Sequence, residues 1–236
     1  MPSGLDLLAL SPPGWGGVLL AGFWNSIQVA VGGFGFGLLI GMAGACGKLY
    51  GGPVTKDLLA VYTTLVRAVP ELVLIVLLYF AGADLLNLAL SVVGLGPVNV
   101  SALGAGIFVI AVVQGAYATE VLRGAIQAIP TGQIEAARAY GMEPFLMFRR
   151  IILPAMLPHA LPGLSNLWLI TTKDTALLAV VGFAELTLVT RQAAGATKHY
   201  FIFFCAAGVL YLALTLTSNL LLRRFELRLR RGMPAG

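Results

Sequence analysis

Long stretches without a single charged side chain constrain this chain more than any other feature of its sequence. Four intervals contain no Asp, Glu, Lys or Arg: residues 7–47, 85–119, 151–172 and 199–222. An α-helix crosses a bilayer core of about 30 Å with about 20 apolar residues, so each interval is long enough for a membrane span. With 58% hydrophobic and only 11% charged residues, the composition is that of an integral membrane protein rather than a soluble domain.

A fifth apolar stretch, residues 58–83, is interrupted only by Arg67 and Glu71. Because these two residues are four apart, a continuous helix would place them on one face. We predict an all-α integral membrane protein with five transmembrane helices, at about 18–46, 58–81, 103–126, 157–181 and 200–223. The remaining apolar segment, 85–96, is too short to cross a bilayer, so we expect it at the outer interface.

The distribution of Lys and Arg predicts the orientation, because short cytoplasmic loops retain positive charge. With the N-terminus outside and the C-terminus in the cytoplasm, eleven of the 15 basic residues lie inside, against Arg191 and Lys198 outside and Arg67 and Lys173 within spans. The eleven are Lys48, Lys56, Arg123, Arg138, Arg149, Arg150, Arg223, Arg224, Arg228, Arg230 and Arg231. The net charge of +5 therefore reflects membrane topology, and no nucleic-acid partner is expected.

A stripe of glycines, Gly33, Gly37 and Gly41, recurs every four residues within the first predicted span. Small residues on one face let a second helix approach closely in a membrane, so the stripe predicts a packing seam. Metal chemistry is not indicated, because His159 and His199 fall on opposite sides of the membrane in this topology. We expect neither a metal site nor a cofactor in this chain.

The most amphipathic segment, EAARAYGMEPFLMFRRIILP, lies between the third and fourth predicted spans, at residues 135–154. After Pro130, we expect Thr131 to cap a short helix and Glu135 to lie in its first turn, where the helix dipole favours an acid. Gly141 is expected to stop this helix in a left-handed conformation. The result is a helix, a bend and a second helix.

The second short helix should begin at Pro144, which suits a first helical turn, and end at Pro154. From composition alone, an interfacial amphipathic element with Arg149 and Arg150 at lipid headgroups is an alternative. Pro154, Pro158 and Pro162 are spaced by four, so we also predict an irregular start to the fourth span.

The same segment contains a pattern of fixed residues at fixed spacing. It reads E-A-A, three residues, G, nine residues, I-x-L-P, and its members are Glu135, Ala136, Ala137, Gly141, Ile151, Leu153 and Pro154. This pattern resembles the EAA signature of permease subunits of bacterial ABC importers. YTTLVRAVPELVLIVLLYF and GAYATEVLRGAIQAIPTGQIEAARAYG are similar to the polar amino acid permeases. Within them, the chain most resembles the Q-type subunits of systems for histidine, lysine, arginine, ornithine or opines such as octopine.

The resemblance implies a type I ABC importer transmembrane domain over residues 18–225, in the bacterial cytoplasmic (inner) membrane. An external segment, 1–17, would precede it and a basic cytoplasmic tail, 226–236, would follow. Loop 131–154 would be a coupling loop that docks on a cytoplasmic ABC ATPase, and the seven residues of the pattern would be its coupling residues. This chain would then be a transport subunit and not an enzyme.

The resemblance also implies the partners. ATP and Mg would be bound by a dimer of separate ATPase subunits, and a periplasmic or surface-tethered binding protein would deliver the amino acid. A related M-type permease is the favoured second membrane subunit, and a homodimer remains open.

Polar groups at membrane depth usually face a cavity or a partner, so they are candidates for the substrate pathway. The candidates are Glu71, Arg67, Gln114, Asn166 and Asp174. Arg67 could instead form a structural pair with Glu71, and Glu120 is expected to pair with Arg123 at the inner interface.

We therefore expect an importer permease for polar amino acids, and specifically for cationic ones. Within the same family, a neutral or acidic substrate such as glutamine is the alternative. A secondary transporter would need ion-coupled acids and commonly inverted repeats, and no convincing internal repeat is present. A scaffold membrane protein would have no use for an EAA loop, and a pull-down of an ATPase separates it from a permease.

Overall fold

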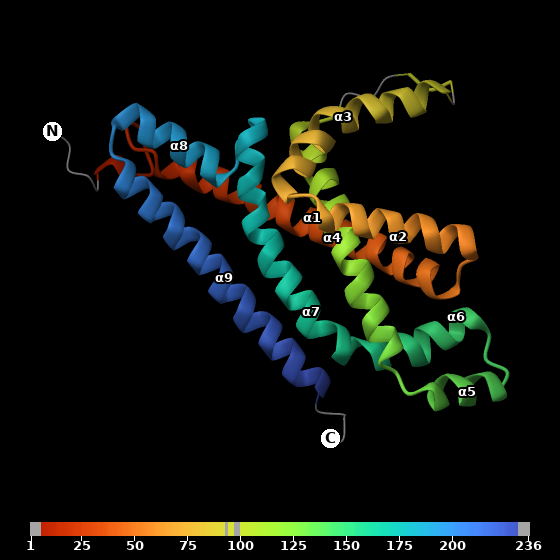
Figure 1. The fold of residues 1–236 in the computed structure, drawn as a ribbon. Coiled ribbons are helices and arrows are strands. Elements are labelled where there is room, and N and C mark those ends of the chain that lie inside the picture. The colour runs from red at the N-terminus through yellow and green to blue at the C-terminus, as the bar shows by residue number, and fades with distance from the viewer. Residues whose placement is uncertain (1–5, 93, 97–99, 231–236) are drawn as a thin grey trace.

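The computed structural model describes residues 6–92, 94–96 and 100–230, and the elements in these ranges are all helical. Figure 1 shows their arrangement. In chain order they are η1 (Asp6–Leu8), α1 (Gly16–Tyr50), α2 (Pro53–Ala68), α3 (Glu71–Val92), α4 (Ala102–Gln127), α5 (Thr131–Ala139), α6 (Pro144–Met147), η2 (Phe148–Ile152), α7 (Leu153–Asp174), η3 (Thr175–Val181), α8 (Leu186–Thr197) and α9 (Tyr200–Arg230). η1 and η3 are 3-10 helices, and η2 is a π-helical turn.

The described residues contain three helices, α1, α4 and α9, that are long and apolar enough to cross a membrane. The number rises to as many as five if each of two bent helix pairs forms one span. α2 and α3 make the first pair, with a bend of 116° between them, and the helical stretch 144–181 makes the second with α8, at 53°.

α1 and α4 pack against each other along the glycine stripe at the centre of the fold (Figure 1). A Cβ atom on Gly33 would lie 2.5 Å from the Ile110 side chain, and one on Gly41 would lie 2.5 Å from the Cβ of Ala118. These distances leave no room for a side chain, so glycine lets the two backbones approach. The predicted packing seam is confirmed, and its other half is α4.

The predicted continuous helix at 58–81 is wrong. α2 ends at Ala68, Val69 is extended, and α3 begins at Glu71. Pro70 explains the break, because it has no N–H to donate and its ring disfavours the helical conformation at the preceding residue. α3 then runs on to Val92, so most of the segment 85–96 is the end of a helix and not a separate piece; residue 93 lies outside the described residues.

The predicted irregular start of the fourth span is wrong for α7 itself, which is a continuous helix from Leu153. The irregular turn comes just before it, and Pro154 does not end the preceding helix. The Leu153 N–H bonds to the carbonyl of Phe148, five residues earlier, which makes the π-helical turn η2 and leads α6 into α7. Pro154 lies in the first turn of α7, where a missing N–H costs no intrahelical bond. Pro158 and Pro162 lie inside α7.

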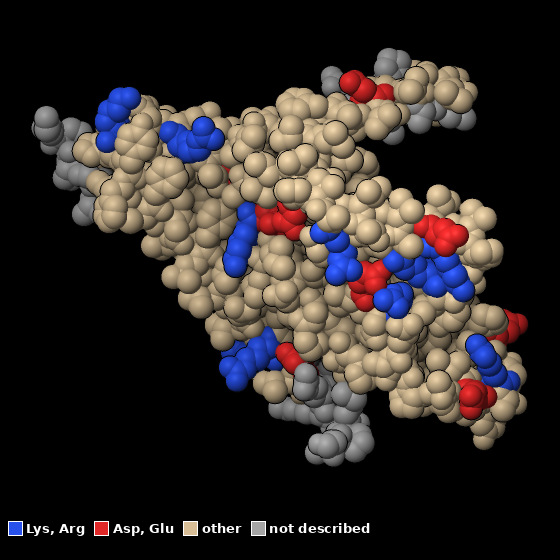
Figure 2. Space-filling model, viewed as in Figure 1, with Lys and Arg blue, Asp and Glu red and all other residues tan. Residues whose placement is uncertain are grey.

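Charged side chains are spread unevenly over the surface in Figure 2. They lie over α2 and across the middle of the view, over the α5–α6 segment, near the C-terminal part of α9 and, as two basic groups, at the α8 end, and much of the remaining surface in this view is uncharged. Large apolar side chains are exposed on several long helices, among them Leu39 on α1, Leu77 on α3 and Val209 on α9. An apolar surface of this extent suits contact with lipid or with another membrane subunit.

Candidate functional site

The segment between α4 and α7 folds as two short helices joined by a tight turn. Two hydrogen bonds close the end of α5: the Gly141 N–H donates to the Arg138 carbonyl at 2.9 Å, and the Met142 N–H donates to the Ala137 carbonyl at 3.1 Å. Gly141 has a φ of 67°, so the pair of bonds forms a Schellman motif. The left-handed stop predicted at Gly141 is confirmed, and the turn has a defined geometry.

The predictions for the start of this segment are wrong in part. The N-cap of α5 is Pro130, which has no capping side chain, and Thr131 is the first helical residue. Glu135 is therefore in the second turn, away from the unpaired N–H groups that the first turn exposes. The prediction for α6 is confirmed, because Pro144 lies in its first turn, after Glu143 as N-cap.

The folded segment brings the two halves of the EAA pattern together. Ala136, Ala137 and Ile151 line one pocket of about 350 Å³ with Gln133, Tyr140 and Met142, although Leu153 and Pro154 continue into α7. Tyr140 is 88% exposed and Phe145 is 76% exposed. Large exposed aromatic side chains suit contact with a protein partner or with a membrane surface.

A second group of polar residues lies among the apolar helices, where α3, α4 and α7 meet. The Gln114 Nε2 atom donates to Asp174 Oδ2 at 2.9 Å, and Glu71 is close enough to interact with both Asp174 and the Tyr117 hydroxyl. Gln114 is only 2% exposed, and its Oε1 atom is buried without a hydrogen-bond partner in the described part of the chain. We call Glu71, Gln114, Tyr117 and Asp174 the membrane acid cluster.

The other two pathway candidates are placed differently. Arg67 is exposed near the end of α2, before the break at Pro70. Its guanidinium is close enough to the Tyr117 hydroxyl for an electrostatic interaction. Between Arg67 and Glu71 the described residues show no ion pair, so the suggested structural pair is wrong. Asn166 is exposed on α7 and its side chain is not part of the cluster. Tyr117 was missed, because a tyrosine in a span is common and gives no signal of its own.

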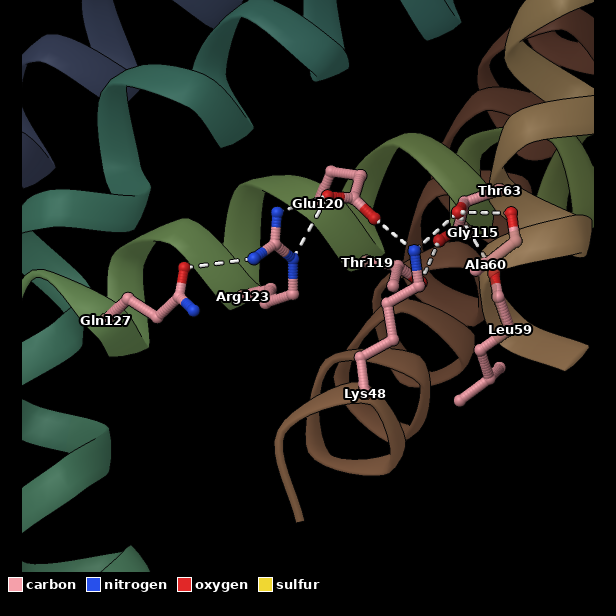
Figure 3. A network of polar contacts seen from close by, with 9 residues as sticks. All are labelled: Lys48, Leu59, Ala60, Thr63, Gly115, Thr119, Glu120, Arg123 and Gln127. Carbon is pink, nitrogen blue, oxygen red and sulfur yellow. Dashed lines mark hydrogen bonds and ion pairs between the residues drawn. The ribbon is translucent and has the colours of Figure 1, made fainter. Parts of the chain in front are cut away.

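A network of polar contacts, with Lys48, Glu120 and Arg123 as its charged members, joins α1, α2 and α4 (Figure 3). The expected pair of Glu120 and Arg123 is confirmed, with 2.8 Å between Glu120 Oε2 and Arg123 Nη2. The other carboxylate oxygen of Glu120 lies 2.6 Å from Lys48 Nζ, which also donates to the Thr63 hydroxyl at 2.6 Å. Lys48 was assigned only to the positive inner face, because nothing in the sequence links it to a residue 72 positions away.

Comparison with known proteins finds relatives that match nearly the whole chain. The OccQ octopine transport system permease protein of Agrobacterium tumefaciens (strain Ach5) is 39% identical over 232 residues, which are 98% of each chain. The HisQ histidine/lysine/arginine/ornithine transport system permease protein of Escherichia coli (strain K12) is 37% identical over 220 residues, covering 93% of this chain and 96% of that one.

A solved structure extends the comparison to three dimensions. The crystal structure of an amino acid ABC transporter with histidines superposes with a TM-score of 0.74 at 29% identity, over 91% of this chain and 95% of that one. The fold is thus that of a type I ABC importer permease. Residues 17–231 match the family described as binding-protein-dependent transport system inner membrane component, and the chain belongs to this family.

Proposed function

We propose that this chain is the membrane subunit of an ATP-driven importer for cationic amino acids or opines, and that the membrane acid cluster recognises the cationic group. One observation carries the choice of substrate. Glu71 and Asp174 meet beside the unpaired Oε1 of Gln114, and neither carboxyl group forms an ion pair with Lys or Arg in the described ranges. Three groups that accept hydrogen bonds suit a guanidinium or ammonium, which only donates them.

Relatives support the same class of substrate. By their names, OccQ serves octopine transport, and HisQ serves the transport of histidine, lysine, arginine and ornithine. Glutamine has one cationic group, its α-ammonium, whereas arginine, lysine and ornithine have two, so two adjoining carboxyl groups suit the cationic substrates better. Two residues remain candidates for contacts outside the cluster: Arg67, exposed near Tyr117, and Asn166, which comes before Asp174 on α7.

The coupling loop, residues 131–154, would dock on the ATPase subunit through the exposed face around Glu135, Tyr140 and Phe145. ATP and Mg would be bound and ATP hydrolysed by that partner dimer, so this chain would need no cofactor. Closure of the ATPase can drive alternating access only through its different affinity for the two states. Because its turn at Gly141 is fixed, the loop would move with the ATPase as a rigid body and would move α4 and α7 with it.

The topology in this proposal has five spans in the inner membrane, with each bent helix pair counted as one. The N-terminal segment, 1–17, would lie outside, and the basic tail, 226–236, in the cytoplasm; residues 1–5 and 231–236, with Arg231 among them, lie outside the described residues. A related permease subunit would complete the pathway, and a binding protein would deliver the substrate.

Substrate-stimulated ATP hydrolysis by the reconstituted importer tests the proposal. Arginine, lysine, histidine, ornithine, octopine, glutamine and glutamate are supplied one at a time with the binding protein. We expect stimulation by one or more of the cationic amino acids or by octopine. Stimulation by glutamine or glutamate alone would refute the choice of substrate.

The variants Glu71→Gln and Asp174→Asn test the cluster in the same assay. Each replaces a carboxyl group by an amide with little change of shape and so removes an acceptor for the cation, and we expect the arginine concentration for half-maximal stimulation to rise about tenfold, the effect of about 1.4 kcal/mol. Asp84→Asn is the matched control, because Asp84 is exposed on α3 away from the cluster. Equal losses for all substrates, together with poor assembly, would leave the two acids a structural role only.

A further inference from the structure

A second acid is enclosed by the fold at the junction of η3 and α8. Glu185 is fully buried and is the N-cap residue of α8. Its Oε1 atom accepts a hydrogen bond from the Leu188 N–H at 2.7 Å, and its Oε2 atom accepts one from the Thr187 N–H at 2.7 Å. The hydroxyls of Tyr211 and Ser26 also donate to Oε2, at 3.1 and 3.4 Å.

These bonds connect three parts of the chain that are distant in sequence. Ser26 comes from α1 and Tyr211 from α9, and both contact the start of α8. The Ser26 hydroxyl also accepts from the Leu186 N–H at 3.1 Å, and the Asn25 side chain donates to the Ala184 carbonyl at 2.8 Å. The backbone around Glu185 is therefore fixed to α1 on one side and to α9 on the other.

A cap alone would not require a carboxylate at this depth. A serine or threonine could accept one bond from the first turn of α8, whereas an acid in the membrane is costly and is usually retained for a function. The carboxylate accepts bonds on both of its oxygens at once, and charge-assisted bonds are roughly twice as strong as neutral ones. The positive end of the α8 dipole, at the start of the helix, further stabilises a negative charge on Glu185.

The junction is connected directly to the membrane acid cluster. η3 begins at Thr175, the residue after Asp174, and it is followed by Gly182 at a φ of 83° and then by Glu185. Thr175 is itself close enough to interact with the Tyr211 hydroxyl that donates to Glu185. A short 3-10 helix thus lies between the two acids, and Tyr211 interacts with Thr175 at its start and with Glu185, four residues after its end.

We propose that Glu185 is a positioning residue, which holds the 53° bend between the α7 segment and α8 and so keeps Asp174 facing Glu71 and Gln114. The expected effect of Glu185 on arginine recognition rests on the proposed function above. Its effect on the bend between α7 and α8 does not depend on which substrate is transported.

Distance measurements across the bend test the geometry. In the full importer, with Cys46 and Cys205 replaced by serine, spin labels are placed at His159→Cys on α7 and Gln192→Cys on α8, both exposed positions. Glu185→Ala should shift or broaden the distribution of distances between the labels, and Glu185→Asp, which keeps the charge, should restore most of it. The control Asp84→Asn should leave the distribution unchanged. An unchanged distribution in Glu185→Ala overturns the proposal.

ATPase assays with arginine as the probe separate positioning from plain stabilisation. Glu185→Ala should raise the arginine concentration for half-maximal stimulation about tenfold, with Glu185→Asp in between. A fall in the maximal rate alone, at unchanged half-saturation, would mean that Glu185 only stabilises the fold. Asp174→Asn is measured in parallel: if it leaves the arginine half-saturation unchanged, the proposed function fails, while the spin-label distances still decide the role of Glu185.

Discussion

Gly141 takes a backbone conformation that costs an L-residue with a Cβ about 1–2 kcal/mol, and a β-branched residue more. Gly141→Val should therefore distort the turn between α5 and α6, leave membrane insertion intact and abolish ATP-driven arginine uptake by proteoliposomes. Gly141→Asn should retain part of the uptake, because asparagine tolerates the left-handed region. Gly132→Val is the matched control, since Gly132 is exposed in the same loop and a Cβ there would meet nothing within 4 Å. Normal uptake by Gly141→Val would contradict the coupling role.

Residues whose partners lie nearby in sequence could be predicted, and those with distant partners could not. Gly141, Pro144 and the pair of Glu120 with Arg123 follow from rules that span a few positions. Glu185 is held by Ser26, 159 residues earlier in the chain, and no local pattern indicates that contact. A local signal for its cap was present nonetheless, because an acid before an apolar helical run is a common start of a helix.

The close packing of α1 against α4 can be tested by comparing alanine substitutions of two glycines on α1. Gly41→Ala would place a Cβ 2.5 Å from the Cβ of Ala118 and 2.9 Å from its carbonyl carbon, whereas a Cβ on Gly35, on the same helix, would meet nothing within 4 Å. Overpacking of this kind costs about 1–3 kcal/mol. We expect Gly41→Ala to lower the Tm of the purified importer in detergent clearly and Gly35→Ala to leave it nearly unchanged. Equal Tm values for the two variants would contradict the close approach of α1 and α4.

Long apolar helices were predictable within a few residues, because length and lack of charge suffice to define them. The prediction at 103–126 corresponds to α4, Ala102–Gln127. Breaks inside long stretches were harder to predict, since a proline alone does not decide whether a helix ends. Pro70 shows the difficulty: Pro158 lies within a continuous helix, whereas Pro70 lies between two helices that diverge by 116°.

For the molecule as a whole, the orientation in the membrane can be tested by labelling. In a background without Cys46 and Cys205, Gln133→Cys on α5 and Lys198→Cys after α8 place single thiols at exposed positions. A membrane-impermeant maleimide added to intact cells should label Lys198→Cys and not Gln133→Cys, and membranes opened to the reagent should give label at both. The reverse pattern in intact cells would overturn the orientation with the N-terminus outside.

The exposed aromatic side chains of the coupling loop also bear on how such a subunit is made. Tyr140 and Phe145 are largely exposed on the segment between α4 and α7, and an exposed apolar patch without its partner is prone to aggregation and attack by proteases. A permease synthesised in excess of its ATPase should therefore be the short-lived member of the complex. Because permease chains without an ATPase partner would be degraded, the number of complete importers in a cell would depend on how well the synthesis of the two subunits is matched.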